Sequence, residues 1–276
     1  MSFARHHARR APGFEFHRPY PGEQLIHFEH LRKAFGPKRV YDDLELDVRA
    51  GETLVVLGGS GTGKSVLLRC LIGLQRPDAG RVLFQGADVT AFTEEQFMEV
   101  RRHVAMVFQG AALFDSLSVG ENVAYPLLEH YPDMPPDEVR RRVAQKLELV
   151  SLPGTEHLMP ADLSGGMKKR VGLARAIATD PEVILWDEPT TGLDPVTTQS
   201  INAMINSMKT KLGCTSIVVT HDLVSAFEVG DRMAMLANRR IVQVGTPDEF
   251  RRSTVPEVRA FLDARRAELV PAGGAS

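Results

Sequence analysis

The residues best suited to chemistry form one glycine-rich stretch that ends in a lysine and a serine. Its members are Gly58, Gly59, Ser60, Gly61, Thr62, Gly63, Lys64 and Ser65. The spacing fits the phosphate-loop pattern, in which glycines let successive backbone N–H groups point at one anion. Lys64 would supply a positive charge to the β- and γ-phosphates, and the Ser65 hydroxyl is placed to ligate Mg²⁺. The stretch therefore predicts a site for a nucleoside triphosphate and a magnesium ion.

The sequence on either side of this stretch gives the context that the pattern needs. Residues 52–57 predict a short buried strand, and residues 66–72 predict the start of an apolar helix that ends at Gly73. A helix that begins directly after the loop adds the positive end of its dipole to the site. The alternative is a glycine-rich turn with a lysine there by chance, and the order of strand, loop and helix disfavours it.

Further polar residues stand at or just beyond the carboxyl ends of other predicted strands: Gln109, Asp187, Glu188 and His221. Ligand sites in open α/β sheets gather at those ends, so these residues can converge on one phosphate. Asp187 can hold the magnesium shell, and Glu188 can orient or deprotonate an attacking water. Gln109 can sense the metal and the water, and His221 can hydrogen-bond the γ-phosphate. A histidine after a strand is more often structural, but the other parts favour a functional role here.

Three more segments contain residues whose role the pattern alone leaves open. Phe35 is either a core residue or a platform for a purine base. Residues 163–167, Leu-Ser-Gly-Gly-Met, open a helix with Ser164 as its N-cap, although Ser-Gly-Gly is also a common linker fragment. Asp194 ends a turn ahead of a helix whose stripe of isoleucine and methionine side chains predicts core packing rather than a cofactor site.

The elements that must position these residues alternate between strands and helices, which predicts an α/β fold. Alternating apolar residues over 25–31 and 40–48 predict antiparallel strands ahead of the phosphate loop. Residues 136–150 predict an amphipathic helix, whereas residues 110–126 read as loop-rich. A last helix, around 255–269, has sparse apolar residues and is either a docking segment or a packed one.

The bulk composition excludes several classes of protein. The chain has 276 residues, of which 43% are hydrophobic and 25% charged, as in ordinary soluble domains. A net charge of −2 gives no global reason to expect nucleic-acid binding. Cys70 and Cys214 fit a reducing compartment, and no apolar run is long enough to span a bilayer. We expect a cytoplasmic protein whose membrane role would come through a partner, with residues 1–23 a disordered basic tail.

These motifs, in this order, resemble the ATPase subunit of ATP-binding cassette (ABC) transporters over roughly residues 24–250. The pentapeptide at 163–167 separates that family from other phosphate-loop proteins. The resemblance implies that Phe35 stacks on the base, that Glu188 is the catalytic base and that His221 is the switch histidine. It also implies that the nucleotide is contacted by the phosphate loop, by the signature residues Ser164, Gly165 and Gly166, and by the D-loop residue Asp194. It further implies a Q-loop at Gln109. Magnesium would be bound by Ser65, Gln109 and Asp187.

The resemblance also implies an architecture and an assembly. It predicts a phosphate-loop NTPase (RecA-like) core, an antiparallel β subdomain and a helical signature subdomain at about 90–178, followed by a C-terminal helix and frayed tail over 251–276. The family works as a head-to-tail dimer in which the signature of one chain completes the ATP site of the other. ATP and Mg²⁺ are the implied cofactors, and no nucleic-acid partner is expected.

A finer resemblance concerns Met167, which stands where the family usually has glutamine. With the sequence after Gln109, it is similar to the ATPases of Mla-type, MCE-associated phospholipid transporters. That implies a homodimer beneath MlaE-like permease subunits with an MlaD-like MCE-domain protein, at the cytoplasmic face of the inner membrane. The loop after Gln109 would meet a permease helix. An importer of amino acids or other small solutes is the main alternative. Soluble DNA-repair or translation cassettes usually contain a coiled-coil insertion or a second cassette, and a kinase or GTPase would leave the signature without a role.

Overall fold

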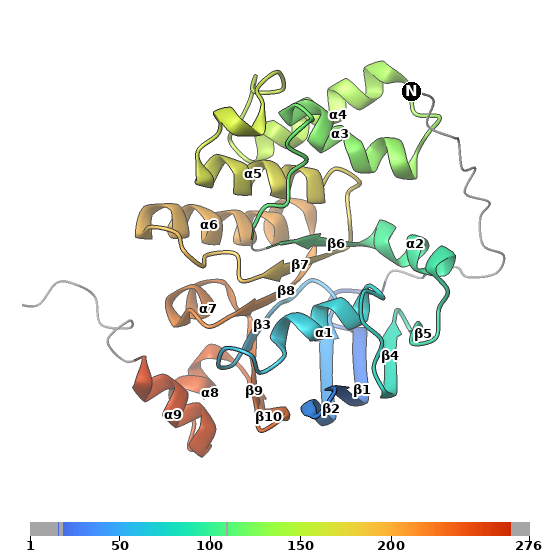
Figure 1. Cartoon of the computed structure of the whole chain (residues 1–276). Helices are drawn as coiled ribbons and strands as arrows, with labels where there is room; N and C mark the ends of the chain where they lie inside the picture. The colour runs from blue at the N-terminus through green and yellow to red at the C-terminus, as the bar shows by residue number, and fades with distance from the viewer. Residues whose placement is uncertain (1–15, 17–18, 109, 266–276) are drawn as a thin grey trace, which may run out of the picture.

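The computed structural model describes residues 16, 19–108 and 110–265, which form two sheets with helices around them (Figure 1). The larger sheet contains, in spatial order, β10 (Arg240–Gly245), β9 (Arg232–Ala237), β3 (Thr53–Leu57), β8 (Thr215–Thr220), β7 (Val183–Asp187) and β6 (Val104–Val107). The smaller sheet contains β2 (Lys38–Arg49), β1 (Gln24–Phe35), β4 (Ala79–Phe84) and β5 (Ala87–Asp88). The expected α/β fold is confirmed.

The larger sheet is parallel from β9 to β6, and only the β9–β10 pair is antiparallel. Every residue of β3, β7 and β8 is buried, which is why these segments are largely apolar and show no alternation with exposed polar residues. Trp186 of β7 is 1% exposed, as expected for a core residue. Parallel pairing brings the carboxyl ends of these strands to one edge of the sheet.

The smaller sheet is antiparallel and packs against the phosphate-loop helix α1 (Lys64–Leu71) in one apolar core. Strands β1 and β2 are joined by a tight turn at Gly36, whose φ of 56° is a conformation that glycine adopts without strain. The ring of Phe16, in the expected tail, lies 5.1 Å from the ring of Phe84 at the end of β4. Phe16 is therefore packed against the smaller sheet.

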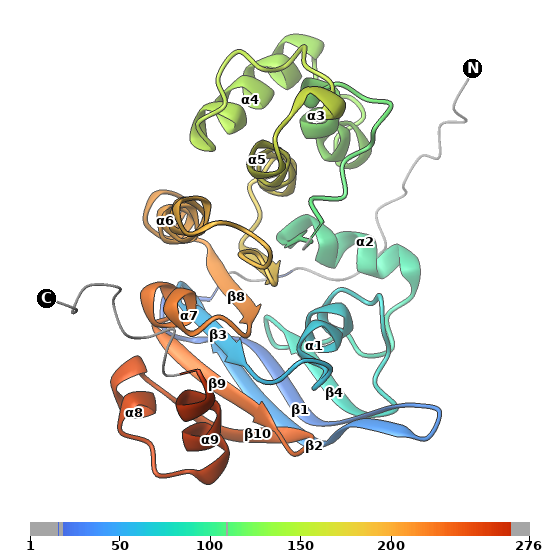
Figure 2. The same cartoon turned by 60° about the vertical axis from the view of Figure 1, so that its left-hand side comes forward.

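The remaining helices flank the larger sheet, and all but the first of them contribute to a second apolar core. They are α2 (Glu94–His103), α3 (Val119–His130), α4 (Pro136–Leu149), α5 (Gly165–Ala176), α6 (Pro195–Leu212) and α7 (Leu223–Val229). The first, α2, packs in the core of the smaller sheet. Helices α3, α4 and α5 lie together on the side of the molecule away from the smaller sheet (Figure 2). A helical subdomain over about 90–178 stays a prediction, and that range includes β6, which belongs to the larger sheet.

The expectation of a loop-rich segment over 110–126 is wrong in its second half, where α3 begins. Ser118 caps this helix: its hydroxyl accepts from the Glu121 N–H at 3.2 Å, and the Glu121 carboxylate accepts from the Ser118 N–H at 2.7 Å. This reciprocal pair satisfies two backbone donors that would otherwise be unpaired at the helix start. Pro126 lies inside α3 and obscured the helical pattern in the sequence.

The end of the described chain is a packed structure. Helices α8 (Pro247–Arg251) and α9 (Pro256–Ala264) follow the β9–β10 hairpin, and Thr246 caps α8 in a reciprocal capping box with Glu249. Val258 is 1% exposed and Leu262 is 7% exposed, and both belong to the core that contains α6 and α7. Of the two alternatives for the last helix, packing is therefore the observed one for α9.

We predict that Leu262→Ala lowers the free energy of unfolding by about 2–4 kcal/mol, because it removes a buried side chain and leaves a cavity. Urea denaturation followed by circular dichroism measures the change. Arg259→Ala, on the exposed side of the same helix, is the control and should stay within about 0.5 kcal/mol of the unaltered protein. Equal stabilities for all three proteins would contradict the packing of α9 against the core.

Candidate active site

The phosphate loop, residues 58–65, connects β3 to α1 and is held from below by β2. Gly63 caps α1 with a φ of 108°, and a Cβ added there would lie 2.3 Å from Val40 Cγ1. The Tyr41 hydroxyl donates a hydrogen bond to the Gly63 carbonyl. At the other end of the loop, a Cβ on Gly58 would lie 2.6 Å from the Leu236 carbonyl oxygen. Only glycine fits these two positions, so the smaller sheet and β9 fix the path of the loop.

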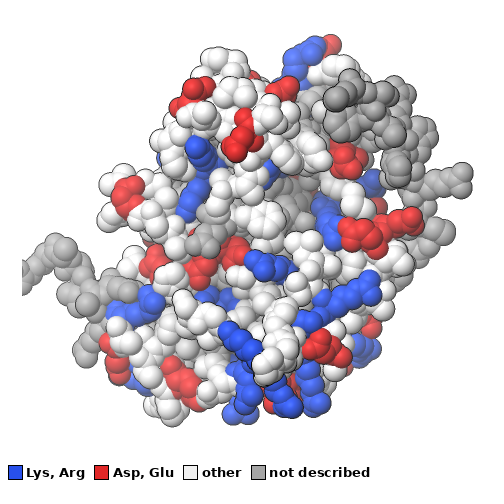
Figure 3. Space-filling view, viewed as in Figure 1, with Lys and Arg blue, Asp and Glu red and all other residues white. Residues whose placement is uncertain are grey.

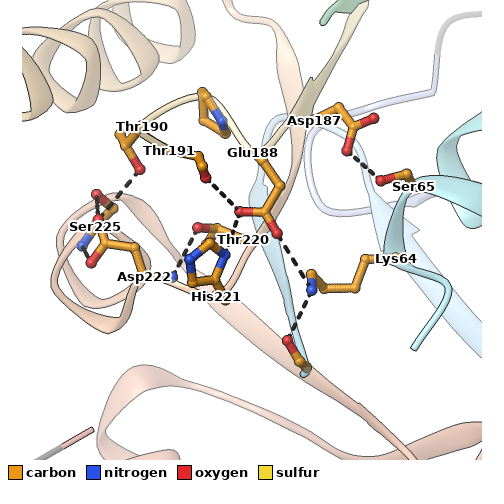
Figure 4. Close-up of polar contacts among 12 residues, drawn as sticks. Lys64, Ser65, Asp187, Glu188, Thr190, Thr191, Thr220, His221, Asp222 and Ser225 are labelled. Atoms are coloured by element: carbon orange, nitrogen blue, oxygen red, sulfur yellow. Dashed lines mark hydrogen bonds and ion pairs between the residues drawn. The ribbon is translucent and has the colours of Figure 1, made fainter. Parts of the chain in front are cut away.

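Lys64 points back across this loop. It is 6% exposed, and its Nζ donates to the carbonyl oxygens of Gly58 at 2.9 Å and Gly59 at 3.1 Å. The same Nζ lies 3.4 Å from Oε1 of Glu188, at the end of β7 (Figure 4). The lysine of the phosphate loop and the carboxylate after β7 therefore meet, as the sequence predicts for residues at the ends of parallel strands.

Ser65 and Asp187 form the second contact across the site. The Ser65 hydroxyl donates to Oδ1 of Asp187 at 2.5 Å, and Asp187 is 6% exposed (Figure 4). A hydroxyl and a carboxylate are the oxygen ligands that Mg²⁺ takes in nucleotide sites, where phosphates and water complete the shell. The described residues contain no cluster of three or more His, Cys, Asp or Glu side chains that could hold a metal by themselves. The pair thus fits a magnesium ion that arrives with a nucleotide.

Glu188 is held on its other side by His221 and Thr191. Its Oε2 lies 2.8 Å from Nδ1 of His221, which follows β8, and accepts from the Thr191 hydroxyl at 3.1 Å (Figure 4). Its backbone φ is 51°, a conformation that residues other than glycine adopt only when their surroundings enforce it. The Glu188 N–H donates to the Val219 carbonyl of β8 at 2.9 Å, which is one such constraint.

The expected signature and D-loop residues lie elsewhere, at the starts of two neighbouring helices. The Ser164 hydroxyl caps α5 by accepting from the Met167 N–H, while Gly165 and Gly166 form the first turn. A Cβ on Gly166 would lie 3.3 Å from Cγ2 of Thr197 in α6. The start of α5 therefore lies beside the start of α6, the helix that follows Asp194.

Asp194 caps α6 and keeps its negative charge there. Its carboxylate accepts from the backbone N–H groups of Val196 and Thr197, each at 3.0 Å. The hydrogen bond from the Thr197 hydroxyl, together with the backbone bonds, holds the pKa of Asp194 below its usual range. An anionic cap at a helix N-terminus is stabilised by the helix dipole.

Phe35 and Lys38 lie at the tip of the β1–β2 hairpin, near the phosphate loop. Phe35 is 44% exposed, and the Nζ of Lys33 lies 5.1 Å from its ring centroid. The Nζ of Lys38 lies 3.6 Å from the point that a Cβ on Gly61 would occupy. Lysine and arginine side chains gather on the lower part of the surface shown in Figure 3. Lys38 and Arg39 at the start of β2, and Arg239 and Arg240 at the β9–β10 turn, are exposed. Gln109 lies outside the described residues.

Two residues of the site were missed in the sequence. Thr191 contacts the Glu188 carboxylate, and Asp222 caps α7 by accepting from the backbone N–H groups of Val224 and Ser225. Asp222 also accepts from the Thr190 hydroxyl at 3.3 Å, which connects the loop after Glu188 to the loop after His221. An aspartate directly before an apolar helical run is an N-cap signal that could have found Asp222.

Comparison with known proteins identifies the class to which this fold and site belong. The family model of the ABC transporter matches residues 41–191. The chain therefore belongs to the ABC transporter family, as an ATP-binding subunit that hydrolyses ATP. The expected resemblance to that family is confirmed.

No helix within the described ranges is long and apolar enough to cross a membrane.

The chain is also similar to individual ATP-binding proteins of described transport systems. One is the probable ribonucleotide transport ATP-binding protein mkl of Mycobacterium leprae, 43% identical over 87% of this chain and 69% of that protein. Another is the intermembrane phospholipid transport system ATP-binding protein MlaF of Escherichia coli K12, 40% identical over 90% of this chain and 91% of that protein. MlaF of Haemophilus influenzae is 38% identical over 87% of this chain and 90% of that protein.

Solved structures of ATP-binding cassettes share the fold. The dimeric post-hydrolysis structure of the cassette MJ0796 bound to ADP and Pi has a TM-score of 0.74 and 29% identity, and covers 81% of this chain and 99% of that one. The structure of cbiO1 from Clostridium perfringens, part of the ABC transporter complex cbiONQ, has a TM-score of 0.77 and 28% identity, and covers 89% of this chain and 97% of that one.

We predict that Gly63→Ala weakens ATP binding at least tenfold, because its Cβ would overlap Val40 and its positive φ disfavours alanine. Gly86→Ala is the matched control. Gly86 also has a positive φ, 78°, but a Cβ there meets no atom within 4 Å. It should therefore bind ATP as the unaltered protein does. Equilibrium titration with a fluorescent ATP analogue compares them, and equal affinities for the two variants would contradict the role given to the Gly63 packing.

Proposed function

We propose that this chain powers phospholipid transport across the cell envelope, as the ATPase subunit of an Mla-type transporter. The observation that carries the proposal is the likeness to the phospholipid-transport ATP-binding proteins of E. coli and H. influenzae, which spans 91% and 90% of those chains. The Leu-Ser-Gly-Gly-Met sequence of residues 163–167 supports the same assignment through the resemblance stated above.

Ribonucleotide transport is the second candidate, because the M. leprae relative with that description is 43% identical. The match covers 69% of that relative. The match to the phospholipid-transport proteins covers nearly their whole length, 90% and 91%. We favour phospholipid transport for that reason. The two candidates differ in the transported molecule and share the same ATPase chemistry.

For ATP hydrolysis, we propose roles that follow the observed contacts. Lys64 binds the β- and γ-phosphates, and Glu188 acts as the general base that takes a proton from the attacking water. Nδ1 of His221 lies 2.8 Å from the Glu188 carboxylate, so His221 can hold this carboxylate toward the phosphate. Gln109 keeps the Q-loop role that the resemblance implies, at the metal and the water.

Magnesium binding is part of the same proposal. Ser65 and Asp187 would hold the ion, which supplies charge neutralisation to the phosphates when bound. The 2.5 Å contact between the two oxygens supports this proposal, because it places both of them on the same side of the loop. Asp187 is buried and therefore pre-positioned by β7 rather than free to sample other rotamers.

We further propose that two copies form the head-to-tail dimer of the family. Phe35 would stack on the base of the nucleotide bound to its own chain, and its exposure leaves one face available. Ser164, Gly165 and Gly166 of the partner copy would complete the phosphate site, together with the D-loop around Asp194. A dimer is also the state of the MJ0796 cassette, whose fold this chain shares.

The permease subunits would bind a groove beside the segment that follows Gln109. This groove has a volume of about 460 Å³ and is lined largely by apolar side chains of α3, α5 and β6. Phe108, Phe114 and Tyr125 are each exposed by 38–44% at its margin, an aromatic grouping that is typical of a binding surface. An MlaE-like permease and an MlaD-like protein, at the inner membrane's cytoplasmic face, are the partners we propose.

We predict that Glu188→Gln binds ATP but loses at least a hundredfold in turnover, because glutamine keeps the shape and cannot accept the proton. Lys64→Ala should instead lose ATP affinity. Glu249→Gln, in the α8 capping box, is the matched control and should keep both. Turnover is measured by phosphate release and affinity by titration. Undiminished turnover in Glu188→Gln would remove Glu188 from the base role.

We predict that a tagged copy of this chain, extracted from its native membranes in mild detergent, co-purifies with a multi-span permease and an MCE-domain protein. Mass spectrometry identifies the chains, and lipid extraction tests for bound phospholipid. A permease with a periplasmic solute-binding protein, or with bound ribonucleotide and no lipid, would move the assignment to small-solute transport. Recovery of ribosomes or DNA in place of any membrane protein would refute the transporter assignment.

A further inference from the structure

A lysine on α5 reaches the loop that follows the Glu188 carboxylate. The Nζ of Lys169 donates to the carbonyl oxygens of Pro189 at 3.0 Å and of Thr191 at 3.2 Å. Burial lowers the pKa of Lys169. The partly buried Lys169 ammonium donates hydrogen bonds to two carbonyl groups of the loop. These bonds fix the position of the loop relative to α5.

The loop connects this lysine to the proposed base. The Thr191 carbonyl accepts from Lys169, while the Thr191 hydroxyl donates to Oε2 of Glu188 at 3.1 Å. The Thr191 N–H also donates to the Glu188 carbonyl at 3.3 Å. One residue is thereby tied to α5 on one side and to Glu188 on the other.

The backbone conformation of Glu188 depends on contacts such as those of Thr191. Its positive φ persists only when the neighbouring structure holds the backbone in place. On the β8 side the backbone is fixed by the bond to Val219. On the loop side, the Thr190 hydroxyl is held by Asp222, and the carbonyls of Pro189 and Thr191 are held by Lys169. Without Lys169, these two carbonyls lose their side-chain donor, and the position of Thr191 relative to the carboxylate is less constrained.

We propose that Lys169 is a positioning residue for ATP hydrolysis: it holds the loop over 189–191 against α5 and, through Thr191, orients the Glu188 carboxylate. This inference rests on the proposed role of Glu188 as the base. Lys169 does not touch the nucleotide in this arrangement. Its effect should therefore fall on turnover and leave ATP binding unchanged.

The test compares Lys169→Met, Thr191→Val and the double variant with the unaltered full-length chain, purified with the membrane partners that accompany it. Each single variant should lower kcat roughly ten- to hundredfold, the effect of a small misplacement of a catalytic group, with KM for ATP within about twofold. The double variant should be no slower than the slower single one, because both changes break one path. Lys169→Arg, which keeps the donors, should recover much of the rate.

Lys168→Met is the matched control, because Lys168 is the same residue type in the same turn and its side chain makes no hydrogen bond or ion pair with another described residue. It should keep the kcat of the unaltered protein. The melting temperatures of all variants, measured by calorimetry, should agree within a few degrees, which a merely structural role of Lys169 would not give.

The outcomes separate this inference from the proposal on which it rests. Loss of turnover in Glu188→Gln together with an undiminished kcat in Lys169→Met would overturn the positioning role alone. Multiplicative effects in the double variant, or a rise in KM in place of a fall in kcat, would overturn it too. Undiminished turnover in Glu188→Gln would overturn both.

Discussion

The Glu188 carboxylate is the point on which the other parts of this site depend. One oxygen meets the Lys64 ammonium, and the other meets the Thr191 hydroxyl and the His221 imidazole. These partners come from the phosphate-loop helix, the loop after β7 and the end of β8. A displacement of any of these three segments would change the direction of the carboxylate. The site therefore needs a framework in which the ends of several strands keep fixed relative positions.

The register of the parallel strands supplies that framework. Leu57 pairs with Thr220, and Asp187 pairs with Val219, so β3, β7 and β8 end at nearly the same level. The residue that follows each strand then enters the site: the phosphate loop after β3, Glu188 after β7 and His221 after β8. Alternate side chains of these strands enter two different apolar cores, so a slip of one residue would exchange the side chains between the cores and disturb the packing of both. Core packing and catalytic geometry are thus set by the same pairing.

Elements and site residues could be predicted from the sequence where a local pattern of residues is itself the physical cause of the structure. The glycine spacing of residues 58–65, the apolar strands and the polar residues after them predicted the meeting of Lys64 with Glu188. The start of α3 was missed because Pro126 contradicts the helical pattern that the Ser118 cap begins. The Lys169 contacts could not be predicted, since they depend on how α5 packs beside the loop after β7. Long-range hydrogen bonds of this kind leave no periodic signal in the chain.

The two neighbouring helix starts differ in charge, and this difference bears on the proposed dimer. Asp194 places a carboxylate at the start of α6, whereas the neutral Ser164 caps α5 and no acidic residue occupies its first turn. The positive end of the α5 dipole is therefore not offset, and a Cβ on Gly165 would meet open space. A phosphate of a second copy would be attracted to α5 rather than to α6. Lys169, one turn further along α5, contacts the loop beside Glu188, so on this proposal one helix would contact the partner's nucleotide and position its own chain's base.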